Sequence, residues 1–155
     1  MTTPTPSTAW QAPEPVAGPA PGVAFADHGP RLIAYIIDTI IIVVAAIVLA
    51  IVGGVVASIV PALAIVPFLG IFIVSLVYFP YYWAKSGQTP GMKQQGIKVV
   101  RDGDGGPVTM GSAILRTIGT WISAAIFYIG FIWIFIDKRR RGWHDLIAGT
   151  VVVKA

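Results

Sequence analysis

The fold of this chain is decided by one long apolar stretch that contains a single acid. Residues 31–60 read RLIAYIIDTIIIVVAAIVLAIVGGVVASIV, and Arg31 and Asp38 are the only charged residues in it. A helix of this length can cross the hydrocarbon core of a bilayer, which is about 30 Å thick. With a rise of about 1.5 Å per residue, Asp38 would lie roughly 10 Å deeper than Arg31. An ionisable group at that depth costs on the order of a few kcal/mol unless it is paired or hydrated, so Asp38 is a candidate functional residue.

The composition of the whole chain is typical of an integral membrane protein. Of its 155 residues, 55 % are hydrophobic and 12 % are charged, whereas soluble domains have about 25 % charged residues. The apolar residues gather in three blocks, at 32–60, 62–84 and 113–136. The net charge of +4 comes from basic residues beside these blocks, which favours contact with lipid headgroups over nucleic-acid binding. The chain has no cysteine, which excludes a disulfide or a thiolate site.

The first 30 residues are expected to form a disordered, proline-rich tail. They hold seven prolines and two acidic residues. Proline fixes φ and lacks a backbone N–H, so this stretch is unsuited to a helix or a sheet. We interpret it as a spacer with polyproline II character, and recruitment of a partner is the alternative. It lacks the basic and apolar sections of a secretory signal, so we expect it to be retained.

The first two apolar blocks predict a helical hairpin. The first block ends at Pro61, and the second follows after a short uncharged link. The second helix therefore returns beside the first. Residues 31–155 are expected to form one membrane domain of the plasma membrane, with the N-terminus in the cytoplasm beside the basic flanks of the helices.

The polar segment 85–112 predicts a small β pairing. Residues 97–100 have the pattern of a short strand, and residues 150–153 form another β-branched run near the end of the chain. A lone strand would leave its backbone groups unpaired, so we expect these two runs to pair on the cytoplasmic membrane surface.

The third apolar block, 113–136, has two interpretations. As one straight helix it would span the bilayer, but its basic flanks would then lie on opposite faces, against the positive-inside rule. As an amphipathic helix followed by a re-entrant piece, it would keep all basic flanks on one side. The expected fold class is therefore all-α integral membrane, a hairpin with a spanning or re-entrant third block and a small β pairing.

Polar residues of the first helix share one face. Arg31, Tyr35 and Asp38 stand at i, i+4 and i+7. Such a stripe must turn toward protein or water rather than lipid. We expect Tyr78 from the second block and Arg116 from the third to be its partners in the membrane.

Three segments resemble the signature of the RDD family of small membrane proteins. Arg31 and Asp38 in the first block look like its first two signature residues. The sequence GQTPGMK at 87–93, followed by GIKVV at 96–100, is similar to the family's cytoplasmic segment after the second helix. The ending RGWHDLIAGTVV at 141–152 resembles its closing motif, with Asp145 as the second aspartate. The resemblance covers residues 30–154 and implies a class whose activity is unsettled, although transport of a ligand or ion has been suggested for it.

Two functions follow as hypotheses. The first is transport of an ion, proton or small solute with Asp38 as the titrating or coordinating group. This hypothesis requires a homo-oligomer or a larger partner, because two spans cannot enclose a pathway. The second is an accessory or assembly subunit of a larger membrane complex, in which Arg31, Asp38 and Asp145 preserve shape. An enzyme is not expected, because no serine elbow, phosphate loop or paired carboxylate set is present. No cofactor or metal is expected either, because the dipeptide at His144 offers too few ligands.

Overall fold

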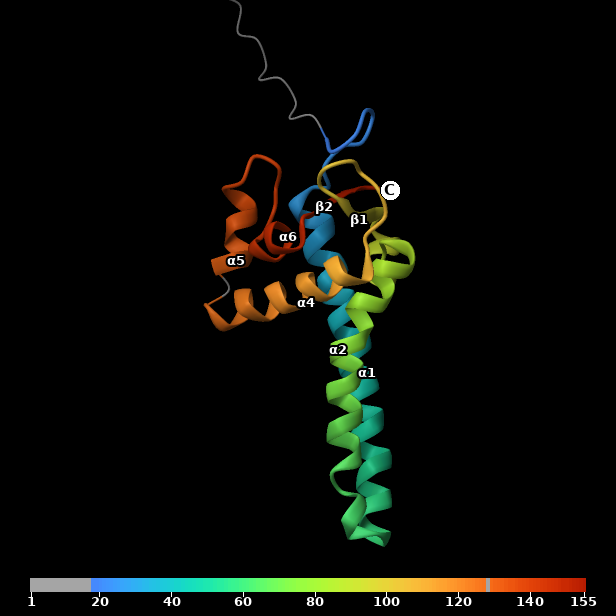
Figure 1. Cartoon of the computed structure of the whole chain (residues 1–155). Coiled ribbons are helices and arrows are strands. Elements are labelled where there is room, and N and C mark those ends of the chain that lie inside the picture. Colours follow the sequence, from blue (N-terminus) through green and yellow to red (C-terminus); the bar gives the residue numbers. More distant parts are fainter. Residues whose placement is uncertain (1–17, 128) are drawn as a thin grey trace, which may run out of the picture.

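The chain folds into a long helical hairpin that carries a small α/β unit at one end (Figure 1). The computed structural model describes residues 18–127 and 129–155, without the side chain of Ser75. The hairpin consists of α1 (His28–Ile59), the 3-10 turn η1 (Pro61–Leu63) and α2 (Val66–Ser86). Both long helices are apolar enough to cross a membrane by length and composition. The predicted hairpin is therefore confirmed.

The unit at the open end of the hairpin, which we call the head, is built from short elements. In chain order these are α3 (Pro90–Gln94), β1 (Ile97–Arg101), α4 (Met110–Ala125), α5 (Ile129–Ile132), the 3-10 turn η2 (Trp133–Phe135), α6 (Trp143–Ala148) and β2 (Thr150–Lys154). The head lies beside the start of α1 and the end of α2, so these two ends of the hairpin support it (Figure 1).

The predicted β pairing of residues 97–100 with residues 150–153 is confirmed. β1 and β2 form an antiparallel pair in which Val99 lies opposite Val152. The Val99 N–H donates to the Gly87 carbonyl at 2.8 Å, and the Val152 carbonyl accepts from the Ala26 N–H at 3.0 Å. The backbone groups of Val99 and Val152 thus point away from each other's strand. They form a non-hydrogen-bonded pair, the type with the closer Cα atoms, about 4.5 Å apart.

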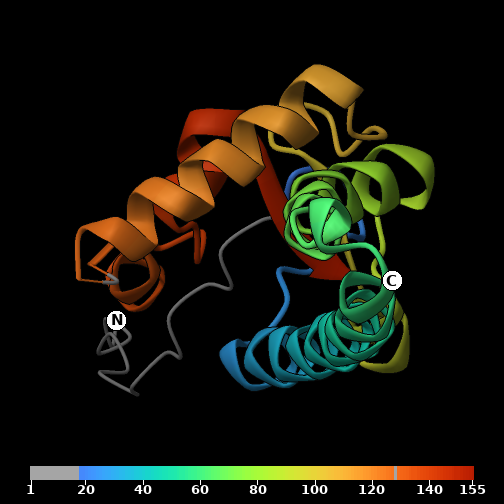
Figure 2. The ribbon, with the colours of Figure 1, turned by 90° about the horizontal axis from the view of Figure 1, so that it is seen from below.

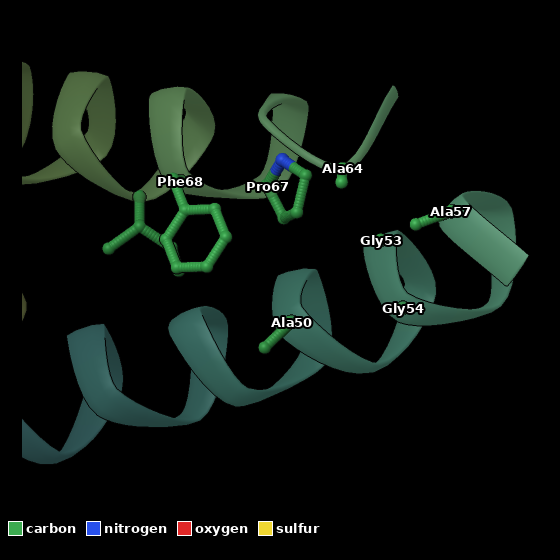
Figure 3. Close-up of a pocket in the computed structure, with 8 residues that line it drawn as sticks. Ala50, Gly53, Gly54, Ala57, Ala64, Pro67 and Phe68 are labelled. Carbon is green, nitrogen blue, oxygen red and sulfur yellow. The ribbon is translucent and has the colours of Figure 1, made fainter. Parts of the chain in front are cut away.

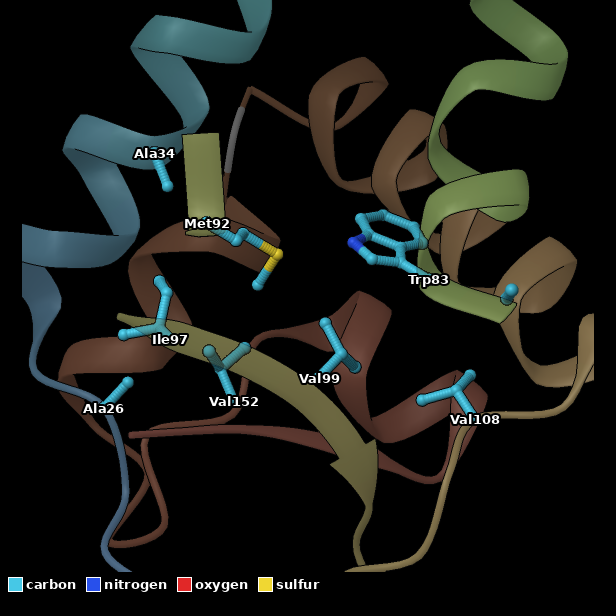
Figure 4. Close-up of a cluster of buried hydrophobic side chains, with 9 residues drawn as sticks. Ala26, Ala34, Trp83, Met92, Ile97, Val99, Val108 and Val152 are labelled. Carbon is cyan, nitrogen blue, oxygen red and sulfur yellow. The ribbon is translucent and has the colours of Figure 1, made fainter. Parts of the chain in front are cut away.

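The hydrophobic core lies between this sheet and the open end of the hairpin. Figure 4 shows Trp83, Met92 and Val99 pointing toward one another from α2, α3 and β1. The cluster consists of Ala26, Ala34, Trp83, Met92, Ile97, Val99, Val108, Ala113 and Val152. Because alternate residues of a strand face opposite sides, Val100 and Val151 pack instead on the outer face with Phe25.

The expected disorder of residues 1–30 is wrong for the last part of that segment. Phe25 forms an isolated antiparallel bridge with Val153, and Ala26 is fully buried. α1 begins at His28, before the apolar block. The physical reason is that this short segment covers the outer edge of β2 and pairs with its backbone. The prediction for residues 1–17 lies outside the described residues.

The third block is not one straight helix. α4 and the following α5–η2 segment meet at an angle of 111°. Figures 1 and 2 both show α4 running across the axis of the hairpin rather than along it. α4 is also amphipathic, with Ala113, Arg116, Thr117, Gly119 and Ser123 buried on one side. Of the two interpretations of residues 113–136, the straight helix is wrong.

Candidate functional site

Asp38 lies in a closed hydrogen-bonded cluster between α1, α2 and α3. Its side chain is 2 % exposed. Its Oδ1 accepts hydrogen bonds from the Tyr78 hydroxyl at 3.0 Å and from the Gly91 N–H at 2.9 Å. Its Oδ2 accepts one from the Thr89 hydroxyl at 2.5 Å. Three donors from two other elements thus replace the water that the carboxylate would lose on burial.

The sequence Thr89-Pro90-Gly91 explains why α3 starts at this point. Thr89 is the N-cap, and its hydroxyl oxygen accepts from the Met92 N–H at 3.2 Å while its hydrogen goes to Asp38. Pro90 occupies the first turn, where a missing N–H costs nothing. Gly91 lets α3 approach α1, since a Cβ there would lie 2.3 Å from the Ala34 carbonyl oxygen. Asp38 therefore holds the N-terminus of α3 against α1.

Asp145 lies in a second cluster, fully buried in the head. Its carboxylate forms an ion pair with Arg116 of α4 and lies 3.8 Å from a guanidinium nitrogen of Arg31. It also accepts from the Gly142 N–H at 3.1 Å, which caps the start of α6. The Arg116 guanidinium donates a second bond to the Thr150 hydroxyl at 2.7 Å. The cluster joins α1, α4, α6 and β2.

The charges of this second cluster fix the protonation of its members. Burial by itself would raise the pKa of Asp145, but the neighbouring Arg116 and Arg31 outweigh it and lower that pKa to about 2. Burial lowers the pKa of His144 to about 4, because the charged imidazolium is penalised there. At neutral pH Asp145 is therefore an ionised carboxylate and His144 a neutral imidazole.

Arg31 connects the first turns of α1 to the C-terminal part of the chain. Its guanidinium donates to the Arg140 carbonyl at 2.5 Å and to the Val152 carbonyl at 3.0 Å. Burial of a guanidinium is tolerated when several acceptors surround it. Arg31 therefore satisfies backbone carbonyls and the Asp145 carboxylate together.

The basic run at residues 138–141 folds back onto the sheet through ion pairs. Asp102 in the turn after β1 pairs with Arg139 at 2.6 Å and with Arg141 at 2.9 Å. Arg140 pairs with Asp27, just before α1, at 2.5 Å. The side chains of the two Asp102 pairs are partly buried, and the Arg140–Asp27 pair is more exposed. Surface pairs contribute little each, about 0–1 kcal/mol, but a network also fixes the path of the loop.

The structure separates residues that the sequence analysis placed on one face. Arg31 and Asp38 lie in different clusters, one in the head and one at the α3 junction. Tyr78 contacts Asp38, as expected. Arg116 pairs with Asp145 rather than with Asp38. The Tyr35 ring is 46 % exposed and lies 6.3 Å from the Phe131 ring, away from either carboxylate.

Thr89 and Gly91 are the site residues that the sequence analysis missed. The signal for them was present, because a threonine followed by proline is a common start of a helix. Nothing in the sequence indicated that this start would dock on an acid 51 positions earlier, as the Asp38–Thr89 hydrogen bond shows.

A separate hollow lies between the far parts of α1 and α2 (Figure 3). It has a volume of about 270 Å³, and its lining side chains are all apolar. Its lining residues are Ala50, Gly53, Gly54, Ala57, Ala64, Pro67, Phe68 and Ile71. It offers no group for acid–base or metal chemistry, and it marks where small residues bring the two helices close.

The comparisons with known proteins found a relative and a family for this chain. A protein of Bacillus subtilis (strain 168) named "Uncharacterized protein YxaI" is 41 % identical over 93 residues, which cover 59 % of this chain and 60 % of that protein. This chain therefore aligns with less than two thirds of that relative. No solved structure matches the chain. The sequence model of the RDD family matches residues 25–149, a range that includes Arg31, Asp38 and Asp145, and this protein therefore belongs to the RDD family.

Proposed function

We propose that this RDD-family chain is a non-catalytic accessory or assembly subunit of a larger membrane protein complex. In this role Arg31, Asp38 and Asp145 hold the head on the hairpin. The observation that carries the proposal is that the carboxylate oxygens of both acids already accept hydrogen bonds or form ion pairs within the protein. Asp38 accepts three hydrogen bonds at 2 % exposure, and Asp145 lies between Arg116 and Arg31 at 0 %. Neither acid has an oxygen free for a passing ion.

The composition of the hairpin supports the same proposal. Between residues 40 and 77 the only side chains with a polar group are those of Ser58 and Ser75. Ion and proton pathways through membranes are lined by charged side chains, backbone carbonyls or chains of polar groups. Residues 40–77 of the two helices have no charged side chain. Assembly of several copies would therefore add only two serine hydroxyls per copy to the lining of a pathway through this part of the hairpin.

Transport of an ion, proton or small solute by a homo-oligomer is the second candidate. Two observations favour it. Asp38 is an acid inside a helix that can span a membrane, and its carboxylate accepts a hydrogen bond from the hydroxyl of half-buried Tyr78. In this case the carboxylate would have to exchange its internal donors for the transported species. The accessory role needs no such exchange.

A flux assay separates the two candidates. Purified full-length wild type, Asp38→Asn and Thr89→Val are reconstituted in liposomes, and proton, Na⁺ and K⁺ fluxes are measured with entrapped dyes. We expect no flux above that of empty vesicles for any of the three. A wild-type flux that Thr89→Val retains and Asp38→Asn abolishes would overturn the proposal, because Thr89→Val removes the cap but keeps the carboxylate.

The partner chain is tested by mild detergent extraction from native membranes and native separation. We expect unlike chains to migrate with this protein in a fixed ratio. Thr89→Val should weaken that assembly, whereas Thr39→Val should not. Thr39 is the matched control because, among the described residues, its hydroxyl bonds the Tyr35 carbonyl of its own helix and no other element. Recovery of a homo-oligomer alone would count against an accessory role.

We also propose that the head and both chain ends lie in the cytoplasm, at the plasma membrane. The basic residues outside the apolar blocks gather at the open end of the hairpin, which favours that side. Reporters fused before Met1 and after Ala155 test this, and we expect both to report the cytoplasm. A periplasmic or extracellular signal from either fusion would contradict it.

A further inference from the structure

α4 presents an apolar face that no described part of the chain covers. This face consists of Ile114, Leu115, Ile118, Trp121 and Ile122, which are 41–47 % exposed. Their spacing of three and four residues places them on one side of a helix. The opposite side packs on α6, where a Cβ at Gly119 would lie 2.8 Å from the His144 Cα.

The direction of this face follows from the packing. α6 and the sheet lie on one side of α4, and the far end of the hairpin extends on the other (Figure 1). Because the buried side of α4 faces α6, the exposed apolar side of α4 faces the side on which the hairpin and its exposed apolar residues extend. The apolar side of α4 and the apolar surface of the hairpin thus lie on the side of α4 that faces away from α6 and the sheet.

The sheet limits how residues 102–149 can be placed relative to a bilayer. Ten residues separate the end of α2 at Ser86 from the start of β1 at Ile97, and β1 pairs with β2 at the C-terminus. The chain between the two strands must therefore start and finish on the same side of any membrane that the hairpin crosses. A single crossing by α4 and α5 would break this pairing.

The described part of the turn between α4 and α5 contains a strongly exposed aromatic residue. Phe127 is 87 % exposed and has φ of 48°, in the left-handed region that favours glycine. A non-glycine residue there is strained, because its Cβ lies too close to the following carbonyl oxygen. A phenyl ring exposed to water gains nothing that compensates this strain, whereas a ring in lipid gains the free energy of removing its apolar surface from water. Trp121 on α4 and Trp133 on η2 are also part-exposed, and tryptophan favours the headgroup boundary.

We propose that α4 and its turn into α5 form an interfacial element, embedded by its apolar face in the lipid leaflet on the head side of the membrane. The occupant of the face is lipid, at the boundary of headgroups and acyl chains. The segment enters from the head side and returns to it, and the protein crosses the bilayer twice. This placement concerns lipid contact alone and stands apart from the proposed accessory role.

The absence of cysteine from the chain allows a direct test of depth. Ile118→Cys and Phe127→Cys variants of the full chain are labelled with bimane in nanodiscs of phosphatidylcholine and phosphatidylglycerol. Quenching is measured with lipids that carry a nitroxide near the headgroup or near the bilayer centre, and with aqueous iodide. Ile51→Cys in the hairpin and Lys93→Cys on α3 serve as the deep and the aqueous references, because both side chains are exposed on the chain itself.

We expect both test sites to be quenched at least twofold more by the shallow nitroxide than by the deep nitroxide or by iodide. Strongest quenching by iodide would place the face in water. Strongest quenching of Phe127 by the deep nitroxide would indicate a third crossing. Protection from all three quenchers would indicate a protein partner, such as a second copy. Each of these three results overturns the proposal, and two test sites keep it testable if one variant fails to fold.

Discussion

The backbone N–H of Gly91 donates a 2.9 Å hydrogen bond to Asp38 across an approach that leaves no room for a side chain at position 91. A Cβ there would lie 2.3 Å from the Ala34 carbonyl oxygen and 3.0 Å from the Asp38 carboxylate carbon. The first signature aspartate and this glycine thus act as one contact between α1 and α3. This contact, rather than the carboxylate alone, places the head on the hairpin.

The first prediction concerns this approach. Gly91→Ala should destabilise the protein by about 2–3 kcal/mol, because the new methyl group forces α3 away from α1 and weakens the bond to Asp38. The free energy of unfolding can be measured by titration of detergent-solubilised protein with a denaturing detergent, followed by tryptophan fluorescence. Gly29→Ala is the matched control, since nothing lies within 4 Å of a Cβ at that position of α1. An equal loss in both variants would contradict the close approach.

The second prediction concerns the strand register. Cysteines at Val99 and Val152 should form a disulfide under mild oxidation, because these residues lie directly opposite in a non-hydrogen-bonded pair. The pair Val99→Cys with Val153→Cys should not, because Val153 packs on the other face of the sheet. Gel mobility with and without reductant gives the result. A disulfide in the control alone would indicate a register shifted by one residue.

Local patterns were sufficient to predict the hairpin and the sheet. The apolar blocks around Pro61 required helices that turn back, and the β-branched runs at 97–100 and 150–153 required partners for their backbone groups. In both cases the same residues determine the element and its burial. The prediction for the site was weaker because it assumed that residues on one helix face share one environment.

Arg31 and Asp38 show why that assumption failed. The two residues lie about two turns apart on α1, and each contacts a different part of the head. α3 docks at Asp38, while the α4–α6 cluster docks at Arg31. Arg116 reaches Asp145 rather than Asp38 because α4 runs across the hairpin, and no sequence period specifies that crossing. Phe25 and Ala26 are likewise held in place by pairing with the outer edge of β2, and that edge exists only once the head has folded.

The third prediction concerns the close contact of the two long helices. A Cβ at Gly53 would lie 2.4 Å from the Pro67 ring, which cannot rotate away, whereas a Cβ at Gly54 has nothing within 4 Å. Gly53→Ala should therefore destabilise the hairpin by about 1–3 kcal/mol. Gly54→Ala should leave stability unchanged or raise it by up to about 1 kcal/mol, because alanine is favoured over glycine inside a helix. The same denaturation titration compares them. Equal stability of the two variants would show that α1 and α2 do not meet at this glycine.

The fourth prediction concerns stability against pH. Burial lowers the pKa of His144 to about 4, below its ordinary value of 6.5. Between these two values the unfolded chain binds a proton that the folded protein excludes, so stability is full above pH 6.5 and falls as the pH is lowered toward 4. The loss attributable to His144 should be on the order of 2–3 kcal/mol.

Asp145 does not interfere with this measurement. Its pKa of about 2 means that its protonation destabilises the protein only below about pH 4. His144→Phe keeps a ring beside Phe131 and should remove most of the slope between pH 6.5 and 4. His28→Phe is the matched control, since His28 also stacks on an aromatic ring, that of Phe135, and the variant retains His144 and therefore its slope. Denaturation titrations at several pH values give the three slopes. If His144→Phe keeps the wild-type slope, the imidazole does not titrate in the buried environment described for it, and the charge balance around Asp145 must differ.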